Sequence, residues 1–191
     1  MEKLEQIKED LKEILSKKRY IHSIGVMEMC EHLAKIYNED VEEAKLAGLL
    51  HDIAKEMSEE EMLNYLEKNN IEVTEVERIN TKILHGKIGA DIAKKKYNVS
   101  KKVADAIKYH TTTSVEMDML AKIVFVSDKI ELNRPSTMYN VEYKRFVAEK
   151  DINKAMLLII NDNIIKLVSK GILINKESID TRNKILIENL K

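Results

Sequence analysis

The chain has 191 residues, of which 44% are hydrophobic and 34% are charged, which suits one folded domain and excludes a disordered tail or a membrane protein. Its formal net charge of −1 disfavours a non-specific nucleic-acid binder, whose surface should be basic. One proline and five glycines supply few turns for a many-stranded sheet, so the composition predicts an all-α fold.

Apolar residues recur with helical spacing along almost the whole chain, which predicts about ten helices. We expect them at residues 3–16, 22–37, 41–55, 59–69, 86–97, 101–110, 118–132, 140–149, 152–169 and 179–190. No element is assigned to residues 70–84. We expect one compact helical bundle over residues 1–191, with a core at about 18–134 and C-terminal helices within 140–190 packing on it.

Local signals support several of these helix ends. Ser58 and Glu61 have the spacing of a capping box, and Ser100 precedes Lys101 as a helix N-cap. Gly171 follows the long helix as a C-terminal stop.

The cellular location is inferred from cysteine use and from the first residues. A single cysteine cannot form an intrachain disulfide, and residues 1–20 lack the apolar stretch of a signal peptide. The longest apolar runs are too short to span a bilayer. We therefore expect a cytoplasmic protein without membrane or nucleic-acid partners.

Six chemically reactive side chains face the apolar side of their helices. By residue spacing these are His22, His51, His85, His110 and Asp128, with Asp52 inside the wholly apolar run 46–54. A lone inward histidine is more often a hydrogen-bonded core residue, but six such groups need a shared counter-charge. No lysine or arginine lies on the same stripes, so a metal ion is the simplest explanation. Histidine and carboxylate ligands suit iron, manganese or zinc.

The ordered series of these residues resembles the HD-domain superfamily of metal-dependent phosphohydrolases. The sequence motifs around these residues are similar to those of the bacterial HD-type symmetrical diadenosine tetraphosphate hydrolases. They comprise residues 19–26, 49–55, 84–86 with 89–90, 106–112, 127–131 with 134, and 181–183. Ser127, Leu132 and Thr113 depart from the pattern, since that family tends to have alanine, proline and glycine at these positions.

The resemblance implies an all-α HD domain that holds at least one divalent metal, with iron expected and manganese, cobalt or zinc as alternatives. The first metal would be held by His22, His51, Asp52 and Asp128. Asp52 would bridge to a second metal at His85 and His110, unless those two histidines bind substrate phosphate directly.

The implied reaction is metal-activated hydrolysis of diadenosine tetraphosphate at its centre, giving two ADP. The expected catalytic residues are Asp52, His85 and His110. The expected substrate contacts are Arg19, His22, His85, His110, Lys129 and Arg134. The departing ADP would be stabilised either by the second metal or by His110 acting as an acid, and both alternatives remain open.

Three other functions remain open from the sequence. An HD phosphohydrolase acting on a nucleoside mono- or triphosphate would release nucleoside or inorganic phosphate rather than ADP alone. A di-iron oxygenase would consume oxygen, and a non-catalytic nucleotide-sensing helical module would bind without turnover. A homodimer is also open, because the apolar faces of the C-terminal helices suit either a core or a dimer contact.

Overall fold

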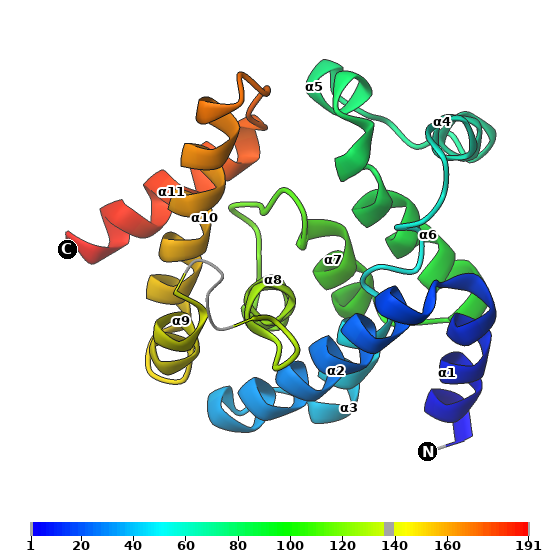
Figure 1. Ribbon diagram of the computed structural model, residues 1–191, viewed down its shortest axis with the longest axis horizontal. Helices are drawn as coiled ribbons and strands as arrows, with labels where there is room; N and C mark the ends of the chain where they lie inside the picture. The colour runs from blue at the N-terminus through cyan, green and yellow to red at the C-terminus, as the bar shows by residue number, and fades with distance from the viewer. Residues whose placement is uncertain (1, 136–139, 191) are drawn as a thin grey trace.

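Helices connected by short turns make up the part of the chain that the computed structural model describes, residues 2–135 and 140–190 (Figure 1). Within these residues there are eleven α-helices, one 3-10 helix and no strand, which confirms the predicted all-α fold. The elements are α1 (Glu2–Ile14), α2 (Lys17–Tyr37), α3 (Val41–Leu50), α4 (Glu59–Lys68), α5 (Glu75–Ile79), η1 (Thr81–Ile83), α6 (His85–Tyr97), α7 (Lys101–Tyr109), α8 (Met119–Ile130), α9 (Val141–Ala148), α10 (Ile152–Ser169) and α11 (Lys176–Asn189).

Helix α8 lies at the centre of the fold, because its residues are apolar on nearly every side. It packs against α2, α3, α7, α9 and α10, and Figure 1 shows it end-on with these helices around it. Phe125 and Ile123 on this helix are almost fully buried. A polar residue on α8, such as Asp128, therefore faces the interior, and other helices can bring partners to it.

The predicted capping signals are confirmed. Ser58 and Glu61 form a reciprocal capping box at the start of α4. The Ser100 hydroxyl accepts a hydrogen bond from the Val103 N–H at the start of α7. Gly171 follows α10 with a φ of +62°, in the left-handed region that a glycine adopts without strain.

Two helix boundaries near the expected site differ from the prediction. Helix α2 begins at Lys17 rather than at residue 22, because the side chain of Ser16 caps it. Helix α3 ends at Leu50 rather than at residue 55, and residues 51–56 form successive turns. The expected helix over 41–55 is therefore five residues too long, and His51 and Asp52 lie at its end rather than within it.

Two further segments also differ. Residues 70–84 contain α5 and η1, and α5 is started by a capping box between Thr74 and Glu77. Helix α11 begins at Lys176 rather than at residue 179, because the Asn175 side chain accepts a hydrogen bond from the Glu177 N–H.

The buried apolar side chains form one large cluster and one small one. The large cluster includes residues from α1, α2, α3, α6, α7, α8, α9, α10 and α11. The small cluster lies beneath α4 and consists of Ala54, Met62, Leu66, Leu84 and Ile88. None of the described helices has both the length and the apolar character that a bilayer span requires.

Candidate metal centre

The turn after α3 fixes the orientation of the His51 ring. Its Nδ1 lies 2.7 Å from the carbonyl oxygen of Gly48, three residues earlier. A carbonyl oxygen can only accept a hydrogen bond, so Nδ1 carries the proton. In the neutral ring Nε2 then keeps its lone pair, which is the form that ligates a metal.

Two other histidines are held in the same way. His85 Nδ1 lies 2.7 Å from the Lys82 carbonyl, and His110 Nδ1 lies 2.6 Å from the Ile107 carbonyl. Each ring thus donates to the carbonyl three residues earlier, where η1 meets α6 and where α7 ends. The two Nε2 atoms face each other at 3.1 Å. Local backbone contacts therefore fix the Nδ1 atom of all three rings and leave each Nε2 atom directed inward.

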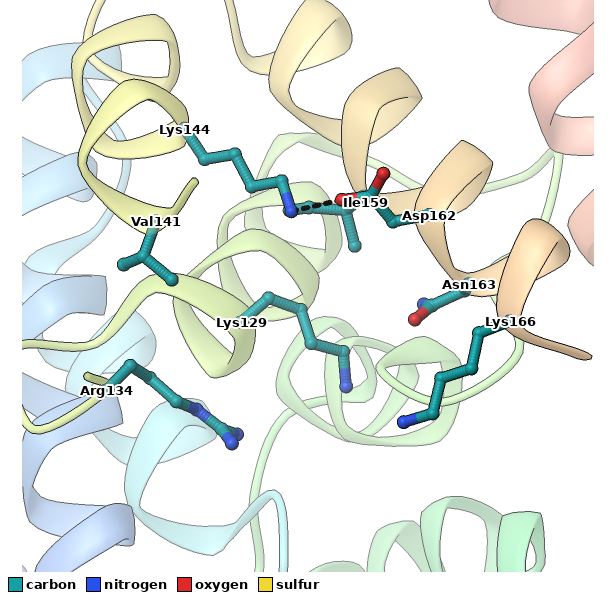
Figure 2. Close-up of a pocket in the computed structure, with 8 residues that line it drawn as sticks. All are labelled: Lys129, Arg134, Val141, Lys144, Ile159, Asp162, Asn163 and Lys166. Carbon is teal, nitrogen blue, oxygen red and sulfur yellow. Dashed lines mark hydrogen bonds and ion pairs between the residues drawn. The ribbon is translucent and has the colours of Figure 1, made fainter. Parts of the chain in front are cut away.

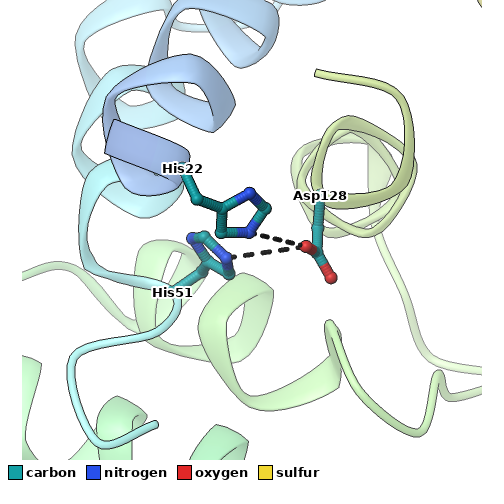
Figure 3. Close-up of side chains that lie close together, drawn as sticks. All are labelled: His22, His51 and Asp128. Carbon is teal, nitrogen blue, oxygen red and sulfur yellow. Dashed lines mark hydrogen bonds and ion pairs between the residues drawn. The ribbon is translucent and has the colours of Figure 1, made fainter. Parts of the chain in front are cut away.

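His22 is oriented by carboxylates from α8 and the turn after it. Its Nδ1 lies 3.2 Å from Glu131 Oε1, and its Nε2 lies 3.0 Å from Asp128 Oδ1. Figure 3 shows the His22 and His51 rings both directed at that Asp128 oxygen. The fold thus brings α2, the end of α3 and α8 to one point.

Asp52 lies between two groups of histidines, and its two oxygens divide between them. Oδ2 is 3.4 Å from His51 Nε2 and 3.7 Å from His22 Nε2. Oδ1 is 3.2 Å from His85 Nε2 and 3.5 Å from His110 Nε2. Asp52 thus contacts all four histidines, two through each oxygen.

The protonation states of three groups suit metal ligands, whereas His22 differs: burial opposes its charge, yet contacts with Asp128 and Glu131 raise its pKa. Burial would raise the pKa of Asp52, but His51, His110 and His85 hold it well below its ordinary value. Burial likewise opposes the charge on Asp128, yet Lys129 and His22 hold the pKa of that carboxyl well below its usual range. Burial lowers the pKa of His110 to about 4. Near neutral pH the two carboxylates are therefore charged and His110 is neutral.

The residues present fit a divalent metal on three counts. Their donor atoms form two groups of ligand size, which are His22, His51 and Asp128, and His51, Asp52 and His110. The His51 Nε2 atom belongs to both groups, is buried and makes no hydrogen bond to any described residue. An unpaired buried acceptor costs about 1–3 kcal/mol, which a ligand would recover. Mixed nitrogen and carboxylate donors suit iron, manganese or zinc.

Basic side chains also contact the two aspartates, although helical spacing predicted no lysine or arginine on the same stripes. Arg19 Nη1 is 2.7 Å from Asp52 Oδ2, and Lys129 Nζ is 2.6 Å from Asp128 Oδ2. Arg134 Nη2 is 3.1 Å from Asp128 Oδ1. The prediction was wrong for Arg19, which precedes His22 by three residues on α2, whereas Lys129 follows Asp128 directly and Arg134 lies beyond the end of α8. The buried charge is thus partly balanced by the protein itself.

The aspartates open onto a cleft of about 480 Å³ that is strongly basic. Seven of the described residues lining it are basic and two are acidic. The basic ones are Arg19, Lys55, Lys82, Lys129, Arg134, Lys166 and Lys170. Figure 2 shows Lys129, Arg134 and Lys166 around an adjoining pocket, where Lys144 is paired with Asp162. Such a cleft suits a polyanion.

Arg19 and Arg134 lie at one boundary of the cleft. These two residues also line a depression of about 760 Å³ that includes Lys17, Lys18 and Ile21. A long ligand can therefore extend from the aspartates in two directions.

Two polar residues at the site were not predicted. Glu131 is 2% exposed and holds the His22 ring, and Lys55 Nζ lies 3.2 Å from His85 Nε2. Glu131 follows Asp128 by three residues and Lys55 follows Asp52 by three, so the same helical spacing could have found both. All the predicted ligands and substrate contacts do gather here, whereas their roles stay predictions.

Comparison with known proteins adds independent findings. A family model described as HD domain matches residues 19–133. The symmetrical bis(5'-nucleosyl)-tetraphosphatase of Halalkalibacterium halodurans is 33% identical over 175 residues, 91% of this chain and 92% of that protein. The protein of the same name from Bacillus subtilis is 32% identical over 162 residues, 84% of this chain and 86% of that protein.

A solved structure is similar over nearly the whole chain. It is a crystal structure from Clostridium acetobutylicum, described as a predicted HD superfamily hydrolase involved in NAD metabolism. It is 35% identical, covers 96% of this chain and 97% of its own, and superimposes with a TM-score of 0.92. The similarity therefore extends beyond the segment that the family model matches.

Proposed function

This chain belongs to the HD-domain family, a family of hydrolases, and we propose that it cleaves diadenosine tetraphosphate symmetrically into two ADP. The observation that carries the proposal is the pair of buried aspartates at the base of a cleft lined by seven basic residues. Similarity to two tetraphosphatases over most of both chains supports the choice of substrate.

His22, His51, Asp52 and Asp128 would hold the first divalent ion, with iron expected and manganese, cobalt or zinc as alternatives. A second ion would be held by Asp52 and by the Nε2 atoms of His85 and His110, which lie 3.2 and 3.5 Å from Asp52 Oδ1. Such ions, when bound, supply Lewis-acid charge and lower the pKa of water from 15.7 to about 7. HD domains bind divalent metals, and the tight cluster of donor atoms supports a metal here.

The protein's own cations would bind and orient the phosphate chain. Arg19, Lys129 and Arg134 form ion pairs with the two aspartates at the cleft. Their fixed positions place donors beside the reacting centre, and arginine can bind two phosphate oxygens at once. Lys55 lies beside His85 and would add a fourth contact to the phosphate chain. Burial lowers the pKa of its ammonium group.

His110 is better suited to ligation than to proton donation. Burial lowers its pKa to about 4, and its Nδ1 proton is committed to the Ile107 carbonyl. A neutral imidazole whose one proton is already bonded is a weak acid. Of the two possibilities left open for the departing ADP, we therefore favour charge stabilisation over protonation by His110.

The two-sided shape of the cleft supports a cut at the middle of the substrate. One ADP half would extend toward Lys166 and Lys170, and the other past Arg19 toward Lys17 and Lys18. A nucleoside mono- or triphosphate would use only one of these directions.

The test is product analysis by anion-exchange chromatography after incubation with diadenosine tetraphosphate. We expect ADP alone, and no product with Asp52→Asn. Asp105→Asn, which removes a carboxylate that pairs with Lys101 and does not line the cleft, is the matched control and should retain full activity. AMP with ATP, or inorganic phosphate from a nucleoside triphosphate at a higher kcat/KM, would contradict the proposal. Binding without turnover at every metal loading would favour the sensing module.

A further inference from the structure

A second cavity, of about 210 Å³, opens off the basic cleft. The cleft and the cavity share five lining residues, which are Asn80, Ile83, Thr111, Lys166 and Leu167. Cavities that enclose a whole drug-sized ligand usually measure about 300–1,000 Å³, so this one suits part of a larger molecule. A ligand in the cleft can therefore place one end group in this cavity.

The lining of this cavity differs in chemistry from the cleft. Its apolar residues are Ile83, Phe125, Ile160, Ile164, Leu167 and Leu173. Among the described residues that line the cavity, only Lys166, at the boundary with the cleft, is charged. The other lining residues are neutral and polar. Such a surface favours a neutral, partly apolar group, while the adjoining cleft favours phosphate.

Two amide side chains in the lining have hydrogen-bonding capacity to spare. No described residue hydrogen-bonds to the side-chain amide of Asn80 or of Asn163, whereas the Ser178 hydroxyl donates to the Thr112 carbonyl. Figure 2 shows the Asn163 amide extending from α10 toward Lys129, with Lys166 beside it. An amide offers both donors and an acceptor, as the edge of a nucleobase requires.

The loop between α7 and α8 forms one wall and holds an unusual backbone conformation there. Thr113 is 2% exposed and has a φ of +59°, which a β-branched residue rarely adopts. The turn is closed by the Thr113 N–H donating to the Tyr109 carbonyl at 2.9 Å. Such outliers persist where the surrounding structure enforces them, and they cluster at ligand sites.

We infer that this cavity binds the nucleoside of one half of the substrate. The base would lie between α10 and the Thr111–Thr113 loop, and Lys166 would contact the phosphate at the shared boundary. The inference rests on the proposed function, because it takes a nucleoside polyphosphate as the ligand. Residues 160–178 of the lining fall outside the segment that the HD model matches, so α10 and α11 would determine which substrate an otherwise common centre accepts.

The direct test compares two non-hydrolysable ligands that differ only in the nucleoside, α,β-methylene-ADP and methylenediphosphonate. Their dissociation constants would be measured by calorimetry with the metal-loaded protein. We expect the nucleotide to bind at least about tenfold more tightly, as burial of its base requires. Equal dissociation constants would overturn the inference.

Two adjacent isoleucines of α10 provide a matched pair of variants. Ile164 lines the cavity, whereas Ile165 is 66% exposed and lines none of the pockets described above. Ile164→Trp should fill the cavity and bring the affinity ratio of the two ligands close to one. Ile165→Trp should keep the wild-type ratio. Preference for the nucleotide retained in Ile164→Trp would contradict the cavity as the nucleoside site.

A second variant covers the case in which Ile164→Trp fails to fold, which loss of methylenediphosphonate binding would reveal. Asn163→Leu is expected to weaken the nucleotide alone, by about twofold to tenfold, as loss of one hydrogen bond does. An unchanged nucleotide affinity in Asn163→Leu would contradict the cavity as the nucleoside site.

These binding measurements need no turnover, so the two proposals fail separately. A protein that prefers the nucleotide but does not cleave diadenosine tetraphosphate would keep the nucleoside site and lose the proposed reaction. A protein that yields ADP but binds both ligands equally would keep the reaction and lose the nucleoside site.

Discussion

Replacing Gly86 by alanine tests how closely α6 and α7 must approach to hold His85 beside His110. A Cβ atom at Gly86 would lie 2.8 Å from the Lys108 carbonyl oxygen and 3.1 Å from Thr111 Oγ1. The first contact is with backbone, so it is relieved only if the two helices move apart. His85 directly precedes Gly86 and His110 directly follows α7, so the same movement separates their Nε2 atoms, which are 3.1 Å apart.

Gly89→Ala in the same helix is the matched control. Its Cβ would meet the Ile53 Cγ2 methyl at 3.3 Å and the Ile107 Cγ2 methyl at 3.5 Å, both of them side-chain atoms that can adjust. Overpacking at Gly86 should cost about 1–3 kcal/mol. Alanine at Gly89 should gain up to about 1 kcal/mol of helix stability, less the cost of a small adjustment.

The assays are urea unfolding, thermal unfolding and steady-state hydrolysis. A difference of about 2 kcal/mol between the variants corresponds to roughly 4–8 °C in Tm for a chain of this size. A misplacement of about 1 Å can cost on the order of 100-fold in rate, so a smaller separation of the histidines should lower kcat about tenfold in Gly86→Ala. If Gly86→Ala matched Gly89→Ala in stability and rate, the close helix approach would not be what positions these ligands.

Three further outcomes are expected. Glu131→Gln should weaken metal affinity about 10- to 100-fold, measured by chelator competition, because this carboxylate orients the His22 ring. The hydrogen bond from Lys96, with others, lowers the pKa of Asp10 to about 2. The ionised Asp10 side chain therefore stabilises the folded state fully above pH 3.8, and this contribution is lost as the pH falls toward 2. Asp10→Asn should thus unfold at lower urea than wild type at pH 7, with a smaller gap at pH 3; a constant gap would contradict this. Burial raises the pKa of Cys30 to about 12, so a thiol reagent at pH 8 should react only after unfolding, and rapid reaction of the native chain would be inconsistent with it.

Several helix ends could be predicted from the sequence, because a capping residue bonds to backbone groups only a few positions away. Ser58, Ser100 and Gly171 act at helix ends as expected from their types. The end of α3 could not be predicted, because residues 47–54 are all buried and, apart from His51 and Asp52, apolar, so the sequence shows no change of period at Leu50. The helix ends where the His51 ring donates a hydrogen bond to the Gly48 carbonyl.

Helical spacing predicted which side chains converge, because a polar group on a buried stripe must find a partner. It could not predict how Asp52 divides its two oxygens, since that depends on the packing of α2 and α6 against the α3 turn. The ion pair of Arg19 with Asp52 joins residues 33 positions apart and was also missed. The nucleoside cavity had no sequence signal, because α10, α11 and the Thr113 loop build it together.

The most direct test of the metal centre is elemental analysis of the protein purified without added metal, beside His51→Gln. We expect one or two divalent transition-metal ions per wild-type chain, and a clear loss in the variant, because His51 Nε2 belongs to both candidate ligand groups. A wild-type protein that is folded, metal-free and unable to take up iron, manganese, cobalt or zinc would contradict a metal at this centre.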